Sequence, residues 1–217
     1  MPLTELHRRV ATVALRVATR YGFALGGGNA LIAHGLISRP TQDVDLFTND
    51  EAGVGAAAAS VEAALQAAGF AAEREDDADG VSDMFEGMDE GLAEWTVTAP
   101  DGQRMMLQMA YFDRTRQPVT MDVGPVLSLE DVVGGKVCAL VSRAEPRDYI
   151  DTAAALKHYS IQDAIRLARR LDPGLEDRDF ADAGRRLDQW ADAVFAPFGL
   201  DAADIARLRA AFADWPR

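Results

Sequence analysis

Three consecutive glycines at residues 26–28, followed by an Asp-Val-Asp segment, constrain the fold of this chain more than any other feature. The apolar residues 23–25 predict a short strand that leads into the glycines, where missing Cβ atoms permit a sharp turn and a close approach to a ligand. We expect Asn29 to cap the helix that follows. The free N–H groups and positive dipole of a helix N-terminus favour an anion such as a triphosphate. The segment therefore predicts a phosphate-binding corner.

The two aspartates of the next segment, Asp43 and Asp45, predict a metal site. The period of two in a strand places both carboxylates on one face and Val44 and Leu46 on the other. Two adjacent carboxylates need a cation, and oxygen ligands beside a phosphate-binding corner suit magnesium, which prefers a few carboxylates plus substrate phosphates. The alternative is a pair of solvated surface carboxylates, but such a pair would not require the glycines upstream.

These segments resemble the signature of the AbiEii-type nucleotidyltransferases, within the polymerase-beta-like superfamily. This family includes toxins of bacterial toxin–antitoxin pairs. The matching residues of the first segment are Gly27-Gly-Asn-Ala-Leu31, His34-Gly-Leu36, Arg39, Thr41 and Asp43-Val-Asp-Leu-Phe47. A second match, to the lysine helix of the family and its following Arg-Asp-x-x-Asp element, lies in Lys136-Val-Cys-Ala-Leu-Val-Ser-Arg143 and Arg147-Asp-Tyr-Ile-Asp151.

The resemblance implies an α+β fold, with a nucleotidyltransferase-like mixed β-sheet flanked by helices and an all-helical C-terminal part. It implies that Asp43 and Asp45 are catalytic and hold magnesium, and it adds Lys136 and Asp148 as catalytic residues. The implied nucleotide-binding residues are Gly27, Gly28, Asn29, Arg39, Thr41 and Arg143. Because Lys136 lies on an otherwise apolar stretch, its ammonium needs an anionic partner. By resemblance, that partner is a nucleotide phosphate or Asp148.

Two positions depart from the family pattern. Asn29 stands where the family has Ser or Thr, and Gln108 stands where the superfamily usually carries a third catalytic carboxylate. Gln108 is a candidate metal ligand through a neutral oxygen. Its alternative interpretations are a hydrogen-bonded core residue and a mark of weakened catalysis. Asp113, Glu86 and Glu94 are other sources of a third carboxylate, and the sequence does not rank them.

Hydrophobic periodicity and turn residues divide the chain into an α/β domain at residues 1–125 and a helical domain at residues 126–217. The predicted strands after the aspartates are 70–75, 84–87, 93–98 and 104–112, the last two as a hairpin around Ala-Pro-Asp-Gly-Gln. The predicted helices are 3–21 and 51–68 in the first domain, and about 128–144, 147–158, 160–171, 176–194 and 201–213 in the second.

Composition limits the classes of function. The net charge of −13 argues against an extended basic surface for nucleic acid. The sequence has no run of the ~18 apolar residues that a membrane helix needs, and its first residues lack a signal-peptide core, so we expect a cytoplasmic protein without a membrane partner. Cys138 is the single cysteine, which excludes an intramolecular disulfide.

Together these features predict a magnesium-dependent nucleotidyltransferase that moves a nucleoside monophosphate from an NTP to a hydroxyl acceptor. By resemblance, the acceptor is an RNA or tRNA end, another protein or a small molecule, and a cognate antitoxin is a further partner. The alternative is a catalytically weak module of the same fold that binds nucleotides or a partner protein. Gln108 and the acidic composition favour that alternative, and turnover would separate the two.

Overall fold

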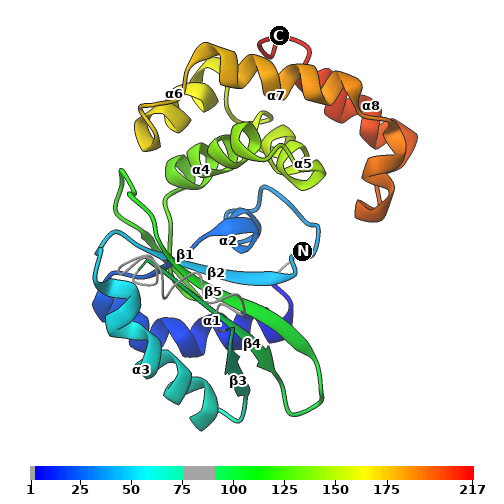
Figure 1. Ribbon diagram of the computed structural model, residues 1–217. Helices are drawn as coiled ribbons and strands as arrows, with labels where there is room; N and C mark the ends of the chain where they lie inside the picture. Colours follow the sequence, from blue (N-terminus) through cyan, green and yellow to red (C-terminus); the bar gives the residue numbers. More distant parts are fainter. Residues whose placement is uncertain (1–2, 76–90) are drawn as a thin grey trace. The chain divides into compact units, whose positions relative to one another are not determined.

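The strand that carries the two aspartates, β2 (Asp43–Thr48), lies in the middle of a mixed sheet (Figure 1). The computed structural model describes residues 3–75 and 91–217, which form seven strands in the order β3-β4-β5-β2-β1-β7-β6. β2 pairs in parallel with β5 and antiparallel with β1, and β1 pairs in parallel with β7. The other strands are β1 (Ala24–Leu25), β3 (Ala71–Arg74), β4 (Leu92–Thr98), β5 (Arg104–Tyr111), β6 (Val119–Met121) and β7 (Gly124–Val126). The predicted fold class is confirmed.

Alternation along β2 gives the sheet a buried and a partly exposed face. Val44 and Leu46 are completely buried, beneath α1 (Glu5–Ala18) and α3 (Gly53–Ala67). Figure 1 shows these two helices on one side of the sheet and α2 (Gly27–Ala33) on the other. The core of this part of the chain thus lies between the sheet and α1 and α3, and the aspartates face away from it.

The described residues divide into two units, Met1–Ser128 and Leu129–Arg217. The division falls between β7 and α4. Helices make up the second unit: α4 (Leu129–Ser142), α5 (Pro146–Ala155), α6 (Ile161–Leu171), α7 (Asp177–Gln189), the 3-10 helix η4 (Asp192–Phe198) and α8 (Ala202–Ala211). The hydroxyl of the buried Tyr149 in α5 donates to the backbone oxygen of Ala183 in α7 at 2.8 Å, which links two of them.

The hairpin of β6 and β7 was not predicted. Gly124 and Pro125 weaken the strand pattern there, because glycine adds flexibility and proline lacks an N–H group. β7 is nevertheless held by β1: Leu25 pairs with Val126, and the N–H of Leu127 donates to the oxygen of Leu25 at 2.9 Å. A contact distant in sequence therefore stabilises this strand. The predicted strand at residues 84–87 lies outside the described residues.

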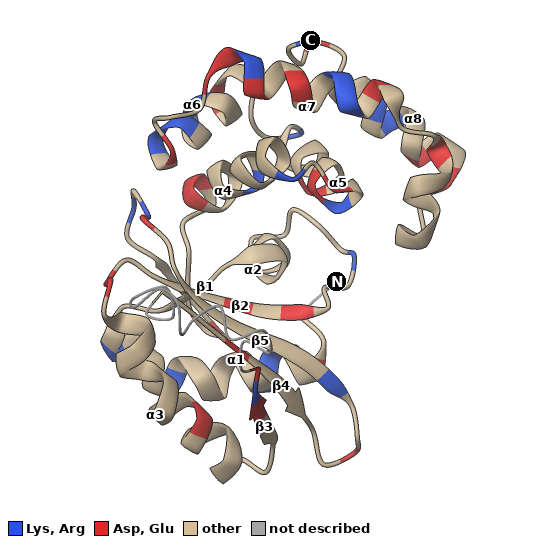
Figure 2. Ribbon diagram, in the orientation of Figure 1, with Lys and Arg blue, Asp and Glu red and all other residues tan. Residues whose placement is uncertain are grey.

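Acidic and basic residues both occur along each of α6, α7 and α8 (Figure 2). Aspartate and arginine three residues apart form exposed ion pairs on each of these helices: Asp163–Arg166, Asp182–Arg185 and Asp204–Arg207. Such pairs each stabilise a helix by roughly 0.3–0.5 kcal/mol. The two signs of charge are therefore interleaved on these helices.

Across residues 3–75 and 91–217, no helix combines the length and the apolar character that crossing a membrane requires.

Candidate active site

Asp43 and Asp45 lie on the same face of β2, as the strand period predicts. Both residues are partly exposed, whereas Val44 and Leu46 on the opposite face are 0% exposed. In Figure 1, α2 lies on the side of the sheet away from α1 and α3. The two carboxylates thus share a surface with the start of α2.

The glycine turn brings the start of α2 directly against Asp45. The N–H of Gly26 donates to the backbone oxygen of Asp45 at 2.8 Å. Gly27 has a φ of 56°, in the left-handed region that favours glycine. A Cβ atom on Gly27 would lie 1.7 Å from Oδ2 of Asp45. The glycine is therefore required both by the backbone conformation and by the position of the carboxylate.

Asn29 does not cap α2, so that prediction was wrong. The helix begins at Gly27 with Gly26 as its N-cap residue, which puts Asn29 inside the first turn, 1% exposed. Its Nδ2 donates to the backbone oxygen of Asp43 at 2.7 Å, and its Oδ1 accepts from Oγ1 of Thr41 at 2.7 Å. The glycines themselves take the cap and the first helical positions, because their flexible backbone allows the turn to pass straight into the helix.

Arg39 and Thr41 lie in the segment between α2 and β2, next to the second helical glycine. A Cβ atom on Gly28 would lie 2.5 Å from Cγ2 of Thr41 and 3.9 Å from a guanidinium nitrogen of Arg39. The structure therefore brings together Gly28, Arg39 and Thr41, three of the residues that the sequence assigned to the nucleotide.

Gln108 lies in register with Asp45 on one side and with Glu94 on the other. Residues that pair across neighbouring strands share a sheet face, so these three side chains form one row over β2, β5 and β4. The Nε2 atom of Gln108 donates to Oε1 of Glu94 at 2.7 Å. Glu94, one of the three candidates for the third carboxylate, thus lies in this row. Glu86 lies outside the described residues, and Asp113 follows the end of β5.

In the helical unit, Lys136 and Asp148 each have an ionic partner. Nζ of Lys136, on α4, is 2.9 Å from Oδ2 of the buried Asp151 on α5. Both oxygens of Asp148, also buried, accept from Arg143, at 2.8 and 2.9 Å. The expected pair of Lys136 with Asp148 is therefore replaced by Lys136 with Asp151. The planar fork of an arginine fits a carboxylate with two parallel hydrogen bonds, which explains the preference of Asp148 for Arg143.

A protein-family model described as "Nucleotidyl transferase AbiEii toxin, Type IV TA system" matches residues 11–216. The chain belongs to the AbiEii nucleotidyltransferase family. It is therefore a nucleotidyltransferase, and the resemblance seen in its motifs is confirmed. A search of curated proteins found no match.

Solved structures share the fold of this AbiEii chain at low sequence identity. One is JHP933 from Helicobacter pylori, with 16% identity and a TM-score of 0.59; the match covers 96% of this chain and 91% of that one. Another is MenT4, a nucleotidyltransferase toxin from Mycobacterium tuberculosis, with 14% identity and a TM-score of 0.61; here the match covers 96% and 82%. At these identities the matches establish the fold alone.

His7 interacts electrostatically with Asp43, a proximity that was not predicted from the sequence of this AbiEii protein. It lies on α1, is 8% exposed, and interacts with the charge of Asp43 and with the backbone of Thr41. Burial lowers the pKa of His7, while the carboxylate of Asp43 and the backbone at Thr41 act in the opposite direction. Its position in an amphipathic helix gave no signal of this proximity, because α1 meets β2 only in the folded chain.

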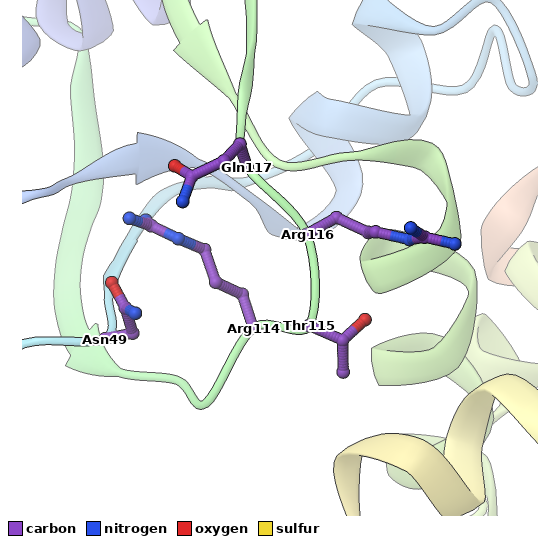
Figure 3. A pocket seen from close by; sticks show the side chains of 5 residues that line it. All are labelled: Asn49, Arg114, Thr115, Arg116 and Gln117. Atoms are coloured by element: carbon purple, nitrogen blue, oxygen red, sulfur yellow. The ribbon is translucent and has the colours of Figure 1, made fainter.

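A separate pocket of about 300 Å³ lies beside the loop that follows β5 (Figure 3). Its lining residues are Asn49, Arg114, Thr115, Arg116 and Gln117. Figure 3 shows the side chain of Arg114 running toward Asn49 and Gln117, with Arg116 extending in the opposite direction. Nη1 of Arg114 also donates to the backbone oxygen of Gly22 at 2.7 Å, which anchors the loop. This pocket contains none of the residues that the AbiEii motifs assign to the active site.

Proposed function

We propose that the protein transfers a nucleoside monophosphate from an NTP to a hydroxyl acceptor in a magnesium-dependent reaction. The observation that carries this proposal is the contact between Gly27 and the carboxylate of Asp45, which joins the phosphate-binding turn to the metal-binding strand. In the reaction, the acceptor oxygen bonds to the α-phosphorus, the bond from that phosphorus to pyrophosphate breaks, and the acceptor releases its proton. Family membership establishes the class of enzyme, and the site chemistry supports the finer assignment.

The residues present fit magnesium. Asp43 and Asp45 supply two carboxylates on one strand face, and Gln108 lies in the next strand in register with Asp45. Among the described residues, no group of three or more His, Cys, Asp or Glu side chains is placed to hold a metal ion. Two carboxylates completed by substrate phosphates are the arrangement that magnesium accepts and zinc does not favour. Bound magnesium would neutralise charge on the attacking and leaving oxygens.

The nucleotide would be held by the backbone of the glycine turn and by Arg39. The N–H groups of Gly27 and Gly28 lie in the first turn of α2, where a helix offers donors to an anion, and would bind phosphate oxygens. The guanidinium of Arg39, near Gly28, adds a fork of donors that suits a phosphate. Asn29 and Thr41 would act by fixing the turn, because their side chains bond to each other and Asn29 also bonds to β2.

The helical unit would contribute positive charge through Lys136 and Arg143. Both cations are already paired with buried carboxylates, Asp151 and Asp148, which fix their positions on α4 and after it. We propose that Lys136 neutralises charge that develops on the nucleotide phosphates during transfer. Asp148 would then act by holding the guanidinium of Arg143 in a fixed position.

The acceptor and the base specificity are tested together. Purified protein would be incubated with each labelled NTP, with and without magnesium, and with separate pools of RNA, protein and small molecules such as aminoglycosides. We expect one pool to become labelled only when magnesium is present. Labelling in all pools without magnesium, or in none of them while nucleotide still binds, would support the catalytically weak module instead.

The family description also supports a biological role as the toxin of a toxin–antitoxin pair. On that basis we propose that a cognate antitoxin counteracts the protein in its host. Expression of the protein in a bacterial host should then arrest growth, and Asp45→Asn should relieve the arrest. Growth arrest that persists with a soluble Asp45→Asn protein would separate toxicity from nucleotidyl transfer.

Lys136→Met tests the role of the lysine, and because Lys136 pairs with Asp151 we expect the substitution to lower stability as well. The substitution removes the ammonium beside Asp151, a completely buried carboxylate, and breaking such a pair typically costs about 3–5 kcal/mol. Adding Asp151→Asn removes both charges and should recover much of this loss. We expect the double variant to unfold near the wild-type temperature and yet to transfer nucleotide ~100-fold more slowly.

The matched control is Lys157→Met, which removes the exposed lysine that follows α5. It should leave both transfer and thermal unfolding unchanged. Wild-type turnover by the double variant would remove Lys136 from the mechanism.

A further inference from the structure

Three side chains form a continuous polar row across the sheet: Asp45 on β2, Gln108 on β5 and Glu94 on β4. Neighbouring strands lie ~4.8 Å apart, so the amide of Gln108 spans the space between the two carboxylates. All three residues are partly buried, and Val44 and Leu46 point to the other face. Gln108, which stands where the superfamily usually carries a third carboxylate, thus has an acidic residue on each side.

The hydrogen bond to Glu94 decides which way the amide of Gln108 points. An ionised carboxylate only accepts hydrogen bonds, whereas an amide has an NH2 donor on one side and an oxygen acceptor on the other. Glu94 accepts a hydrogen bond from Nε2 of Gln108 at 2.7 Å. The amide oxygen of Gln108 is therefore turned away from Glu94. In this row, the direction away from Glu94 is the direction of Asp45.

We propose that Glu94 is a positioning residue, which holds the amide oxygen of Gln108 toward Asp45 and thereby completes the magnesium site. This inference rests on the proposed function. Gln108 and Glu94 would together replace the missing carboxylate, with the neutral oxygen binding the metal and the negative charge one strand further away. Residues that orient a metal ligand typically change metal affinity by 10–100-fold when they are replaced.

The first test is Glu94→Gln, read out by the binding of Mn²⁺, followed by electron paramagnetic resonance in place of Mg²⁺. A glutamine at this position can donate or accept, so it no longer selects one orientation of the Gln108 amide. We expect Mn²⁺ affinity to fall about 10-fold, with an unchanged temperature of unfolding. The control is Glu73→Gln on β3, which makes the same chemical change on the same face but in the neighbouring row, through the pairing of Glu73 with Thr96. It should bind Mn²⁺ as the wild type does.

The second test exchanges the two side chains. Gln108→Glu alone would place two carboxylates next to each other, and we expect like-charge repulsion to destabilise the protein. In the variant that combines Gln108→Glu with Glu94→Gln, the carboxylate at position 108 would accept a hydrogen bond from the amide at position 94. Its other oxygen would then face Asp45. The exchanged protein should therefore regain at least wild-type Mn²⁺ affinity.

The outcomes distinguish this inference from the proposed function. If Asp45→Asn binds Mn²⁺ as tightly as the wild type, the metal assignment itself fails. If Asp45→Asn loses Mn²⁺ binding while Glu94→Gln retains it, the metal assignment stands and the role of Glu94 is wrong. If Glu94→Gln weakens binding but the exchanged protein does not recover it, Glu94 acts by itself and does not position Gln108.

Discussion

Replacing Asp45 with alanine is expected to slow nucleotidyl transfer by about 1,000-fold or more while leaving the free energy of unfolding close to that of the wild type. Asp45 contacts the glycine turn and lies on the face of β2 that also carries Asp43. The several kcal/mol of charge stabilisation that a metal supplies in such a site correspond to about three powers of ten in rate. The measurements are pyrophosphate release from a labelled NTP and thermal unfolding.

Stability should survive because Asp43 and Asp45 repel each other when no cation is bound, so removing one carboxylate relieves that repulsion. Asp45→Asn is the matched variant, since it keeps the shape of the side chain beside Gly27 and removes only its charge. It should lose transfer to a similar degree. Wild-type turnover by either variant would contradict the metal assignment.

Gly27→Ala is expected to have the second largest effect, a loss of transfer of about 100-fold. An added Cβ atom would lie 1.7 Å from Oδ2 of Asp45, so the carboxylate has to move by more than 1 Å. A displacement of that size at a reacting centre can reduce the rate by about 100-fold. The positive φ of 56° adds strain of roughly 1–2 kcal/mol, which should appear as a lower temperature of unfolding.

Gly35→Ala separates the two effects of the Gly27 substitution. Gly35 has a φ of 77°, so alanine is strained there as well, but its Cβ atom would meet no other atom within 4 Å. We therefore expect Gly35→Ala to lower the temperature of unfolding to a similar degree and to leave transfer intact. An equal loss of transfer in both variants would show that Gly27 acts through stability alone.

The sequence was sufficient to place the aspartates and the glycine turn, because both depend on local rules. Alternation along β2 requires Asp43 and Asp45 to share a face, and a run of glycines before a helix marks a close backbone approach. Asn29 was misplaced because the helix takes Gly26 as its N-cap residue, three residues earlier than predicted. The side chain then bonds to Thr41 and to the backbone of Asp43, contacts that no local pattern specifies.

The pairing of Glu94 with Gln108 could have been predicted from the sequence. The hairpin of β4 and β5 was predicted, and its register is symmetric about Asp101, which pairs Thr98 with Arg104 and Glu94 with Gln108. Fixing the turn would therefore have ranked Glu94 above the other candidate carboxylates. Pairing Lys136 with Asp151 instead of Asp148 was not predictable in this way, because it depends on how α4 and α5 pack.

The amide of Asn29 has a consequence for nucleotide binding that goes beyond its structural role. A flexible segment loses conformational entropy when it binds a ligand, at roughly 1–2 kcal/mol for each residue that becomes ordered. The side chain of Asn29 donates to the backbone oxygen of Asp43, which joins the start of α2 to β2, and accepts from the hydroxyl of Thr41. These residues are therefore ordered when the protein folds, and at the proposed site an incoming NTP would meet a preorganised turn. More of its binding energy would then remain available to stabilise the transition state of transfer.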